Sequence, residues 1–302
     1  MKIPQKIKPG SKIRIISPAG NIEKSKVLPA VKWLEKQGYL VELGQYVFAQ
    51  HFQFAGTDEQ RLHDLQTAFD DPETDVIICS RGGYGTVRII DKVDFTKFLQ
   101  HPKWLVGFSD ITALHLALHK KEIATAHAAM PAFFFDKNGI PNQNLDLLMS
   151  LLSRENLTYS FGNNSFNRTG DVTAEIIGGN LSIIASLLGT EFEPDTDGKI
   201  LFLEDVDEYL YHIDRLIHQL KLAGKFDKLA GLVLGDFTEI KDNDSPFGQT
   251  VEEIISAAVK DYSFPVCFGF QAGHNNVNKA LAFGEKWELN VTNTGTILNC
   301  KR

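Results

Sequence analysis

Ser109 stands where a side chain could act as a nucleophile. It follows the apolar segment Trp104–Gly107 and precedes a helix-like pattern. A serine at such a strand-to-helix turn exposes its hydroxyl at the carboxyl edge of a sheet, and the N–H groups of the helix amino terminus face any oxyanion formed there. Ile111 occupies the position of the second glycine of the GxSxG hydrolase pattern, so the motif is incomplete. Ser109 is therefore a candidate nucleophile or a cap of the following helix.

A nucleophilic serine needs a base, and a histidine base needs an acceptor that orients its other nitrogen. Among the nine histidines, His274 lies in a glycine- and asparagine-rich loop after an apolar run, where functional side chains are often displayed. His127, which ends another apolar segment, is a reserve candidate. His115 and His119 share one predicted helix face, but neither an HExxH pattern nor a third ligand accompanies them. We expect these two to be solvated or core-edge histidines.

Glu204 is the candidate acceptor for the histidine. It directly follows a predicted buried strand, Lys199–Leu203, where it would face the same sheet edge as Ser109. It also opens an acidic run, 204–208, that can equally serve to cap the helix that follows. Both interpretations stay open from the residues alone.

The glycine-rich segment Ser80–Gly85 (SRGGYG) follows another predicted strand. It has neither the Walker spacing nor a full GxGxxG, so it does not indicate a nucleotide site. Glycines let a backbone approach a substrate closely and turn an N–H group inward. Gly83 is therefore a candidate oxyanion donor and Arg81 a candidate partner for a substrate carboxylate. A structural turn explains the segment equally well.

The first half of the chain has the alternating pattern that would position these residues. Apolar runs at Lys12–Ser17 and Asp75–Ser80 are strand-like, whereas Lys24–Gln37 and Thr57–Phe69 have the apolar period of helices. Such βαβ units form a mainly parallel sheet flanked by helices. The predicted fold class is therefore α/β.

A polar stretch, residues 161–170, is the predicted linker between two domains, because it is rich in asparagine and glycine and lacks periodicity. The N-terminal domain, residues 1–160, would carry the nucleophile. The smaller C-terminal α/β domain, residues 171–302, would carry Glu204 and His274. Its tail is predicted to be β-rich, with a hairpin at Trp287–Ile297.

Composition narrows the class of protein. The 302 residues are 43% hydrophobic and 23% charged, as in folded globular proteins, and the formal net charge of −7 argues against a nucleic-acid partner. Three scattered cysteines favour reduced thiols. No signal-peptide pattern or long apolar run is present, so we expect no membrane partner and a cytoplasmic location.

Six segments, taken in order, resemble the serine LD-carboxypeptidase family, which includes the microcin C immunity hydrolases. They begin in the glycine-rich segment and end around His274: SRGGYGTVRIID from Ser80, LVGFSDITALH from Leu105, IIGGNLSIIASLLGT from Ile176, LFLEDVDEYLYHIDRLIHQLKLAGKF from Leu201, LAGLVLGDF from Leu229 and FGFQAGHNNVNKALAFG from Phe268. The resemblance covers nearly the whole chain.

The resemblance implies a serine peptidase with a triad on two domains. On matching positions, Ser109 is the nucleophile, His274 the general base and Glu204 the carboxylate that orients it. The backbone N–H groups of Gly83 and Asp110 would form the oxyanion hole. No metal or cofactor is implied, the partner is a small peptide substrate, and the protein is expected to be a homodimer.

The implied reaction is release of the terminal D-alanine from a murein tetrapeptide through an acyl-enzyme. Two alternatives remain: hydrolysis of a peptidyl-nucleotide or related amide that gives self-immunity, and a non-catalytic protein that binds a peptide or sugar. The sequence departs from the family where members usually carry His-Gly-Pro, because it has His127-Ala128-Ala129 there. A role of that loop in substrate recognition is not expected to carry over.

Overall fold

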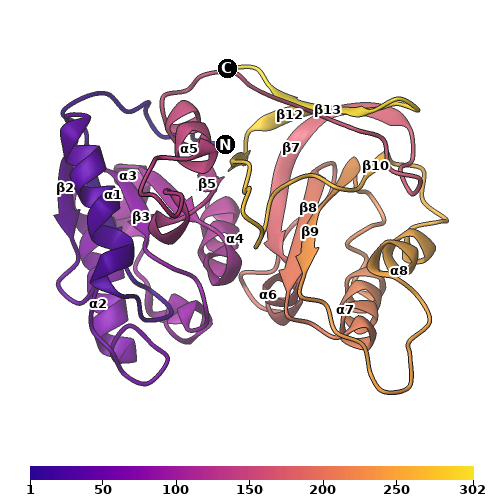
Figure 1. Ribbon diagram of the computed structural model, residues 1–302, viewed down its shortest axis with the longest axis horizontal. Coiled ribbons are helices and arrows are strands. Elements are labelled where there is room, and N and C mark those ends of the chain that lie inside the picture. The colour runs from indigo at the N-terminus through magenta and orange to yellow at the C-terminus, as the bar shows by residue number, and fades with distance from the viewer. The chain divides into compact units, whose positions relative to one another are not determined.

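Two sheets, each in its own unit of the chain, organise the computed structural model, which describes residues 1–302 (Figure 1). The first unit comprises residues 1–155 and 279–284, and the second comprises residues 156–278 and 285–302.

The first sheet has six strands in the order β11-β5-β4-β3-β1-β2. Its five N-terminal strands are parallel, and β11 pairs with β5 in the antiparallel sense. The central strand β3 is apolar along most of its length, as expected for a parallel strand covered on both faces. The bounds are β1 Lys12–Ile16, β2 Leu40–Leu43, β3 Thr74–Cys79, β4 Trp104–Gly107, β5 Thr125–His127 and β11 Leu281–Phe283.

The helices of the first unit have clear start signals in places. Thr57 caps α2, and its side chain and that of Gln60 form a capping box with the backbone. The helices are α1 Lys24–Lys36, α2 Asp58–Asp70, α3 Thr96–Gln100, α4 Thr112–Lys120 and α5 Gln143–Leu152. Single 3₁₀ turns are η1 Thr86–Arg88, η2 Ile90–Lys92, η3 Ser109–Ile111 and η4 Pro131–Phe133.

The second sheet has seven strands in the order β10-β9-β8-β7-β12-β13-β6. Strands β7 to β10 are parallel, whereas β12, β13 and β6 continue from β7 in the antiparallel sense. The strands are β6 Leu157–Phe161, β7 Gly170–Asn180, β8 Ile200–Val206, β9 Gly231–Thr238, β10 Val266–Cys267, β12 Lys286–Val291 and β13 Thr296–Cys300. The helices are α6 Leu181–Ser186, α7 Leu210–Leu222 and α8 Val251–Ala258.

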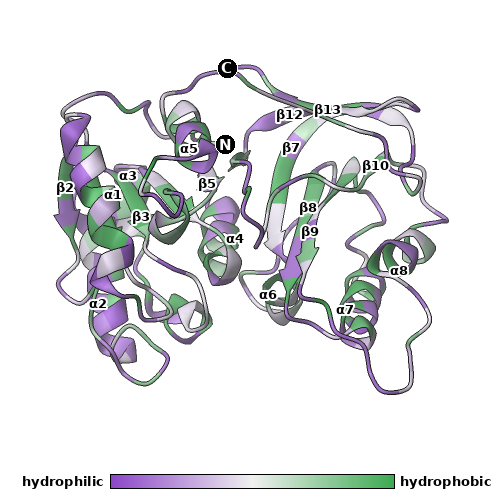
Figure 2. Cartoon of the chain, in the orientation of Figure 1, coloured by the Kyte–Doolittle hydropathy of each residue, from purple (hydrophilic) through white to green (hydrophobic).

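The predicted fold class is confirmed: the first sheet is mainly parallel with helices, and the second unit is smaller, α/β and β-rich toward the C-terminus. In Figure 2 the strands β8 and β9 are largely green, whereas α1 carries both purple and green residues, as a helix with one apolar face should. The three cysteines are free and buried, as expected. None of the helices combines the length and apolar character needed to cross a bilayer.

The two compact units are divided at other residues than the predicted domains. The stretch expected as a linker, 161–170, lies inside the second unit, because β6 precedes it and pairs with β13. Residues 279–284 join the first unit, because β11 adds to the edge of its sheet beside β5. Short segments that pair across such a sequence distance leave no local signal.

Gly178 shows how tightly the second sheet is packed. Its φ is 146°, and a Cβ at this position would overlap the backbone of Phe202 on the neighbouring strand β8. No side chain can be accommodated there without moving one of the two strands.

We expect Gly178→Ala to lower the free energy of unfolding by more than about 2 kcal/mol, because it combines a strained φ with a backbone clash. Urea unfolding followed by circular dichroism measures this change. Gly162→Ala is the matched control, because a Cβ there meets nothing within 4 Å. Equal stability of the two variants would contradict the packing described.

Candidate active site

Ser109 occupies a strained strand-to-helix turn. It comes two residues after β4 ends, begins η3 and has a φ of 65°, a left-handed conformation that non-glycine residues rarely adopt. Strained residues of this kind gather at functional sites, and the nucleophile of an α/β hydrolase sits on such a turn. Neither η3 nor α4 has a side-chain cap hydrogen bond at its start. The left-handed turn favours the interpretation of Ser109 as a displayed functional side chain.

The glycine-rich segment after β3 packs against this turn. A Cβ on Gly82 would lie 2.8 Å from Ser109 Cβ and 3.0 Å from Ser109 Oγ, so only glycine lets the backbone come this close. The next residue, Gly83, has a φ of 98°, and Gly20 N–H donates to Gly82 O at 2.9 Å. The close approach of Gly82 could not be predicted from the sequence, which pointed to Gly83, because two adjacent glycines give no signal of which one faces a side chain.

The two remaining candidates of the first unit differ in exposure. Arg81 is exposed and donates from Nη1 to the carbonyl of Asn21 at 2.9 Å. The side chain of Asp110 is buried, and its Oδ2 accepts a hydrogen bond from the backbone N–H of Thr86 at 2.8 Å. Burial raises the pKa of Asp110, although its hydrogen bonds with Thr86 oppose the shift.

His115 is a core residue, so the expectation that it would be solvated or at the core edge is wrong. It is 1% exposed, its Nε2 contacts the carbonyl of Gly107 at 2.9 Å, and its Nδ1 contacts Thr125 Oγ1 at 2.8 Å. Because a carbonyl only accepts, Nε2 carries the hydrogen and Nδ1 accepts from the threonine. Burial lowers the pKa of His115 to about 4. The neutral ring thereby holds the end of β4 that leads to Ser109.

The reserve candidate, His127, is also a core residue. It is fully buried, and its ring lies near the rings of Phe108 and Phe283, with centroids 6.1 Å and 5.3 Å away. His119 is buried as well, with 8% exposure.

In the second unit, His274 and Glu204 lie in contact. His274 Nδ1 is 2.7 Å from Glu204 Oε2, and the glutamate side chain is fully buried, whereas that of the histidine is 17% exposed. Burial lowers the pKa of His274, but the charge of Glu204 and this hydrogen bond outweigh burial and raise it above its ordinary value. A carboxylate that accepts at Nδ1 leaves Nε2 as the basic nitrogen.

Glu204 lies within β8, at a register irregularity between Leu203 and Asp205, rather than after the end of a strand. The expectation that it shares the sheet edge of Ser109 is wrong, because β8 belongs to the second sheet and β4 to the first. Its neighbour Asp205 serves α6 instead, accepting from Ser182 N–H at 3.0 Å. Burial and then the charge of the neighbouring Glu204 raise the pKa of Asp205 to about 7.

Gly273 allows the histidine loop to approach Glu204. Its φ is 138°, and a Cβ there would lie 3.0 Å from Glu204 Oε2 and 3.3 Å from Asp236 Cβ. The glycine before His274 is thus required for the hydrogen bond between the histidine and the buried carboxylate.

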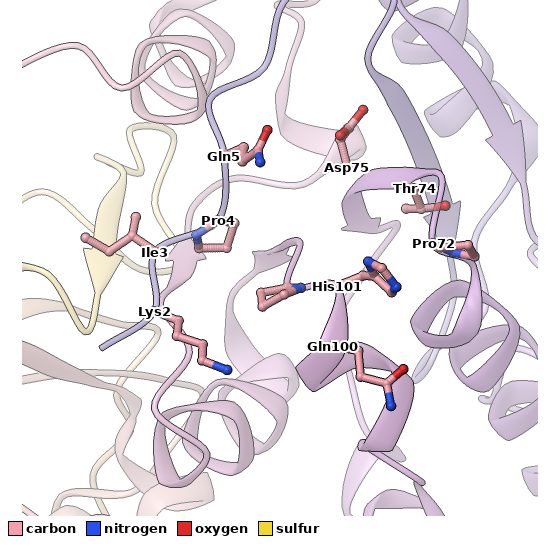
Figure 3. Close-up of a pocket in the computed structure, with 10 residues that line it drawn as sticks. Lys2, Ile3, Pro4, Gln5, Pro72, Thr74, Asp75, Gln100 and His101 are labelled. Carbon is pink, nitrogen blue, oxygen red and sulfur yellow. The ribbon is translucent and has the colours of Figure 1, made fainter.

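A separate pocket of about 580 Å³ lies at the opposite edge of the first sheet (Figure 3). It is lined by residues such as Lys2, Thr74 and His101, and Thr74 begins β3, whereas the glycine-rich segment follows the end of β3. Ligands of open α/β sheets bind at the carboxyl ends of the strands. The pocket is therefore remote from the turn that carries Ser109. The structure contains no group of three or more metal-binding side chains.

We expect Gly82→Ala to slow the reaction of Ser109 with a fluorophosphonate by at least about tenfold, because the added methyl displaces the serine from its turn. Labelling rates followed by in-gel fluorescence measure this. Gly162→Ala should label at the wild-type rate. A Gly82→Ala protein that folds and labels normally would show that the close approach is unimportant.

The pKa of His115 predicts an acid-sensitive contribution to stability. The pKa of His115 is about 6.5 in the unfolded chain but about 4 in the folded protein, so between these pH values protonation favours the unfolded chain. The contribution of the neutral ring to stability is therefore present above pH 6.5 and is lost as the pH falls toward 4. The free energy of unfolding should fall by about 2 kcal/mol between pH 7 and pH 5 from this group alone. Denaturant titrations of wild-type and His115→Gln protein isolate the contribution, and identical pH dependences in the two would contradict it.

Comparisons with known proteins place the two halves of the chain in one context. Residues 13–128 match the model of an LD-carboxypeptidase N-terminal domain, and residues 173–289 match that of an LD-carboxypeptidase C-terminal domain. A probable murein peptide carboxypeptidase of Bacillus subtilis is 33% identical over 298 residues, covering 98% of this chain and 93% of the relative.

Two further relatives extend the comparison. The crystal structure of a muramoyltetrapeptide carboxypeptidase from Oxalobacter formigenes superposes with a TM-score of 0.87 at 30% identity, covering 96% of this chain and 99% of that one. The microcin self-immunity protein MccF of Escherichia coli is 24% identical over 310 residues, covering 92% of this chain and 90% of the relative.

Proposed function

The chain belongs to the LD-carboxypeptidase family of hydrolases, and we propose that it is a serine peptidase that removes the terminal D-alanine from murein-derived tetrapeptides. The resemblance found in the sequence is thus confirmed at the level of the family. Support for the substrate comes from two relatives whose names refer to murein peptide and muramoyltetrapeptide carboxypeptidases.

The hydrogen bond between His274 and Glu204 carries the proposal. A buried carboxylate on Nδ1 fixes the tautomer and stabilises the imidazolium that forms when the other nitrogen takes a proton. In this proposal His274 Nε2 is the general base for Ser109, whose strained turn suits a nucleophile.

The proposed reaction is acyl transfer in two steps. His274 takes the proton of Ser109 Oγ as the oxygen attacks the scissile carbonyl, and the backbone N–H groups of Gly83 and Asp110 hold the oxyanion. The imidazolium gives its proton to the amine of the leaving D-alanine. Water, deprotonated by His274, then attacks the acyl-enzyme, and the imidazolium returns the proton to Ser109 Oγ as the shortened peptide leaves. Arg81 is proposed to bind a substrate carboxylate.

A second candidate function uses the same chemistry on a different amide. The relative MccF is named as a self-immunity protein against a microcin, which favours a peptidyl-nucleotide or related amide as the alternative substrate. Identity is lower with MccF than with the Bacillus subtilis relative, so murein peptides are the first choice. The non-catalytic binding protein is the third alternative, and it predicts no turnover of either substrate.

The assembly and location complete the proposal. We propose a homodimer, by extension from the family resemblance, and a cytoplasmic location, from the sequence pattern of the amino terminus. Sedimentation equilibrium of the purified protein measures the first, and a monomer at micromolar concentration would contradict it.

Incubation with murein tripeptide, tetrapeptide and pentapeptide tests the function. D-alanine should be released from the tetrapeptide alone, and Ser109→Ala should lower kcat by at least about 10³-fold because the nucleophile is lost. A D-amino-acid oxidase assay measures the release. His274→Ala should lose activity to a similar extent, since the triad acts as a unit.

The thermal midpoint of Ser109→Ala serves as the control and should stay near the wild-type value, whereas that of His274→Ala should fall because the buried Glu204 carboxylate loses this partner. Normal turnover by Ser109→Ala would eliminate the proposed nucleophile. Hydrolysis of an aminoacyl sulfamoyl nucleoside without any release of D-alanine would favour the second function.

A further inference from the structure

Thr86 ties the glycine-rich segment to the nucleophile turn. It begins η1 directly after Gly85, and both of its donors reach one atom, Asp110 Oδ2: the backbone N–H at 2.8 Å and the hydroxyl Oγ1 at 2.5 Å. Thr86 is fully buried and Asp110 is 1% exposed, so water does not compete for these bonds.

Asp110 takes part in the proposed oxyanion hole with its backbone. It follows Ser109 within η3, and its N–H is one proposed donor, whereas the other is the N–H of Gly83, three residues before Thr86. One residue therefore carries the first donor on its backbone and, with its side chain, grips the segment that carries the second.

Arg61 anchors the same segment from the other side. Its guanidinium is buried, and Nη1 donates to the carbonyl of Gly85 at 2.8 Å and to that of Pro18 at 2.7 Å. A Cβ on Gly85 would lie 2.5 Å from this nitrogen, so glycine is needed for the contact. The peptide between Gly85 and Thr86 is thus held by its carbonyl and by its N–H, from α2 and from η3 respectively.

We propose that the Asp110 side chain is a positioning residue that, through Thr86, fixes the spacing of the two oxyanion donors, with Arg61 as the second anchor of the loop. This inference rests on the proposed function, because it assigns a purpose to the oxyanion hole of that reaction. Both donors must lie 2.7–3.1 Å from the developing oxyanion, and an error of about 1 Å can reduce the rate by about 100-fold.

The chemistry of the two hydrogen bonds between Thr86 and Asp110 favours a positioning role for Asp110 over a role in stabilising the fold. Removing a carboxylate from water is unfavourable, and apolar side chains of similar volume often fill such sites with equal or greater stability. A buried carboxylate with two donors from one residue gives a defined distance and direction instead.

The test compares Thr86→Val, which keeps the shape and the backbone N–H but removes the hydroxyl donor, with Thr86→Ser, which keeps both donors. Two assays are used. The first measures kcat and KM for D-alanine release. The second measures the rate at which a fluorophosphonate labels Ser109, since the phosphoryl oxygen of the reagent also requires the oxyanion hole. We expect Thr86→Val to lower kcat and the labelling rate by about tenfold with KM within about twofold, and Thr86→Ser to stay close to wild type.

Asp110→Asn should lower both rates further, by about 100-fold, because the amide is a poorer acceptor. Thr158→Val is the matched control: this residue is exposed on β6 of the second unit, its hydroxyl donates to Asn299 Oδ1 at 2.9 Å, and loss of that hydroxyl should change neither rate. Thermal midpoints of all variants identify any loss of folding.

The two readouts separate failure of the inference from failure of the proposed function. If the wild-type protein is labelled at Ser109 but releases no D-alanine, the proposed substrate is wrong. The labelling rates of the variants would still test the positioning role of Asp110. Wild-type rates in Thr86→Val, or a loss confined to KM, would overturn the positioning role of Asp110.

Discussion

The hydrogen bond between His274 and the fully buried carboxylate of Glu204 is the interaction on which the proposed chemistry depends. A carboxylate without solvent must be satisfied by a partner, so the pair holds the imidazole in one orientation and one tautomer. The second unit is built to allow this: the register irregularity in β8 presents Glu204, and Gly273 lets the loop close on it. The hydrogen bond to Glu204 thus sets both the orientation of the His274 ring and the nitrogen that carries its proton.

The first unit meets the matching requirement by backbone geometry rather than by charge. Ser109 is held at a φ of 65° between β4 and α4, and the neutral ring of His115 fixes the preceding strand through the carbonyl of Gly107. Gly82 leaves space for the serine, and Asp110 holds the loop beyond it. The strand before Ser109 and the loop that faces it are thus both constrained, which is how a rigid scaffold maintains a strained conformation.

Much of the fold could be predicted from the sequence because its signals are local. The strands and helices of the first half and the C-terminal hairpin follow from apolar period and turn residues, and β4, β12 and β13 lie close to their predicted positions. Long-range pairing could not be predicted: β11, which lies far along the chain in the predicted C-terminal domain, joins the first sheet beside β5. Nor could the burial of His115, since its two hydrogen-bond partners are brought to it only by the fold. The triad roles came from the family resemblance and not from spacing.

The placement of β11 has a consequence for how the chain can be divided. The chain passes between the units after residues 155, 278 and 284, so no single cut separates them. A fragment ending at Glu155 would lack β11 and leave the backbone of β5 as an open edge, the kind of surface through which strands of separate molecules join. Independent folding of a contiguous fragment of the first unit is therefore disfavoured. Strand β11, which completes the first sheet, follows the loop of His274 by only a few residues. The first sheet therefore cannot be completed until most of the second unit has been synthesised.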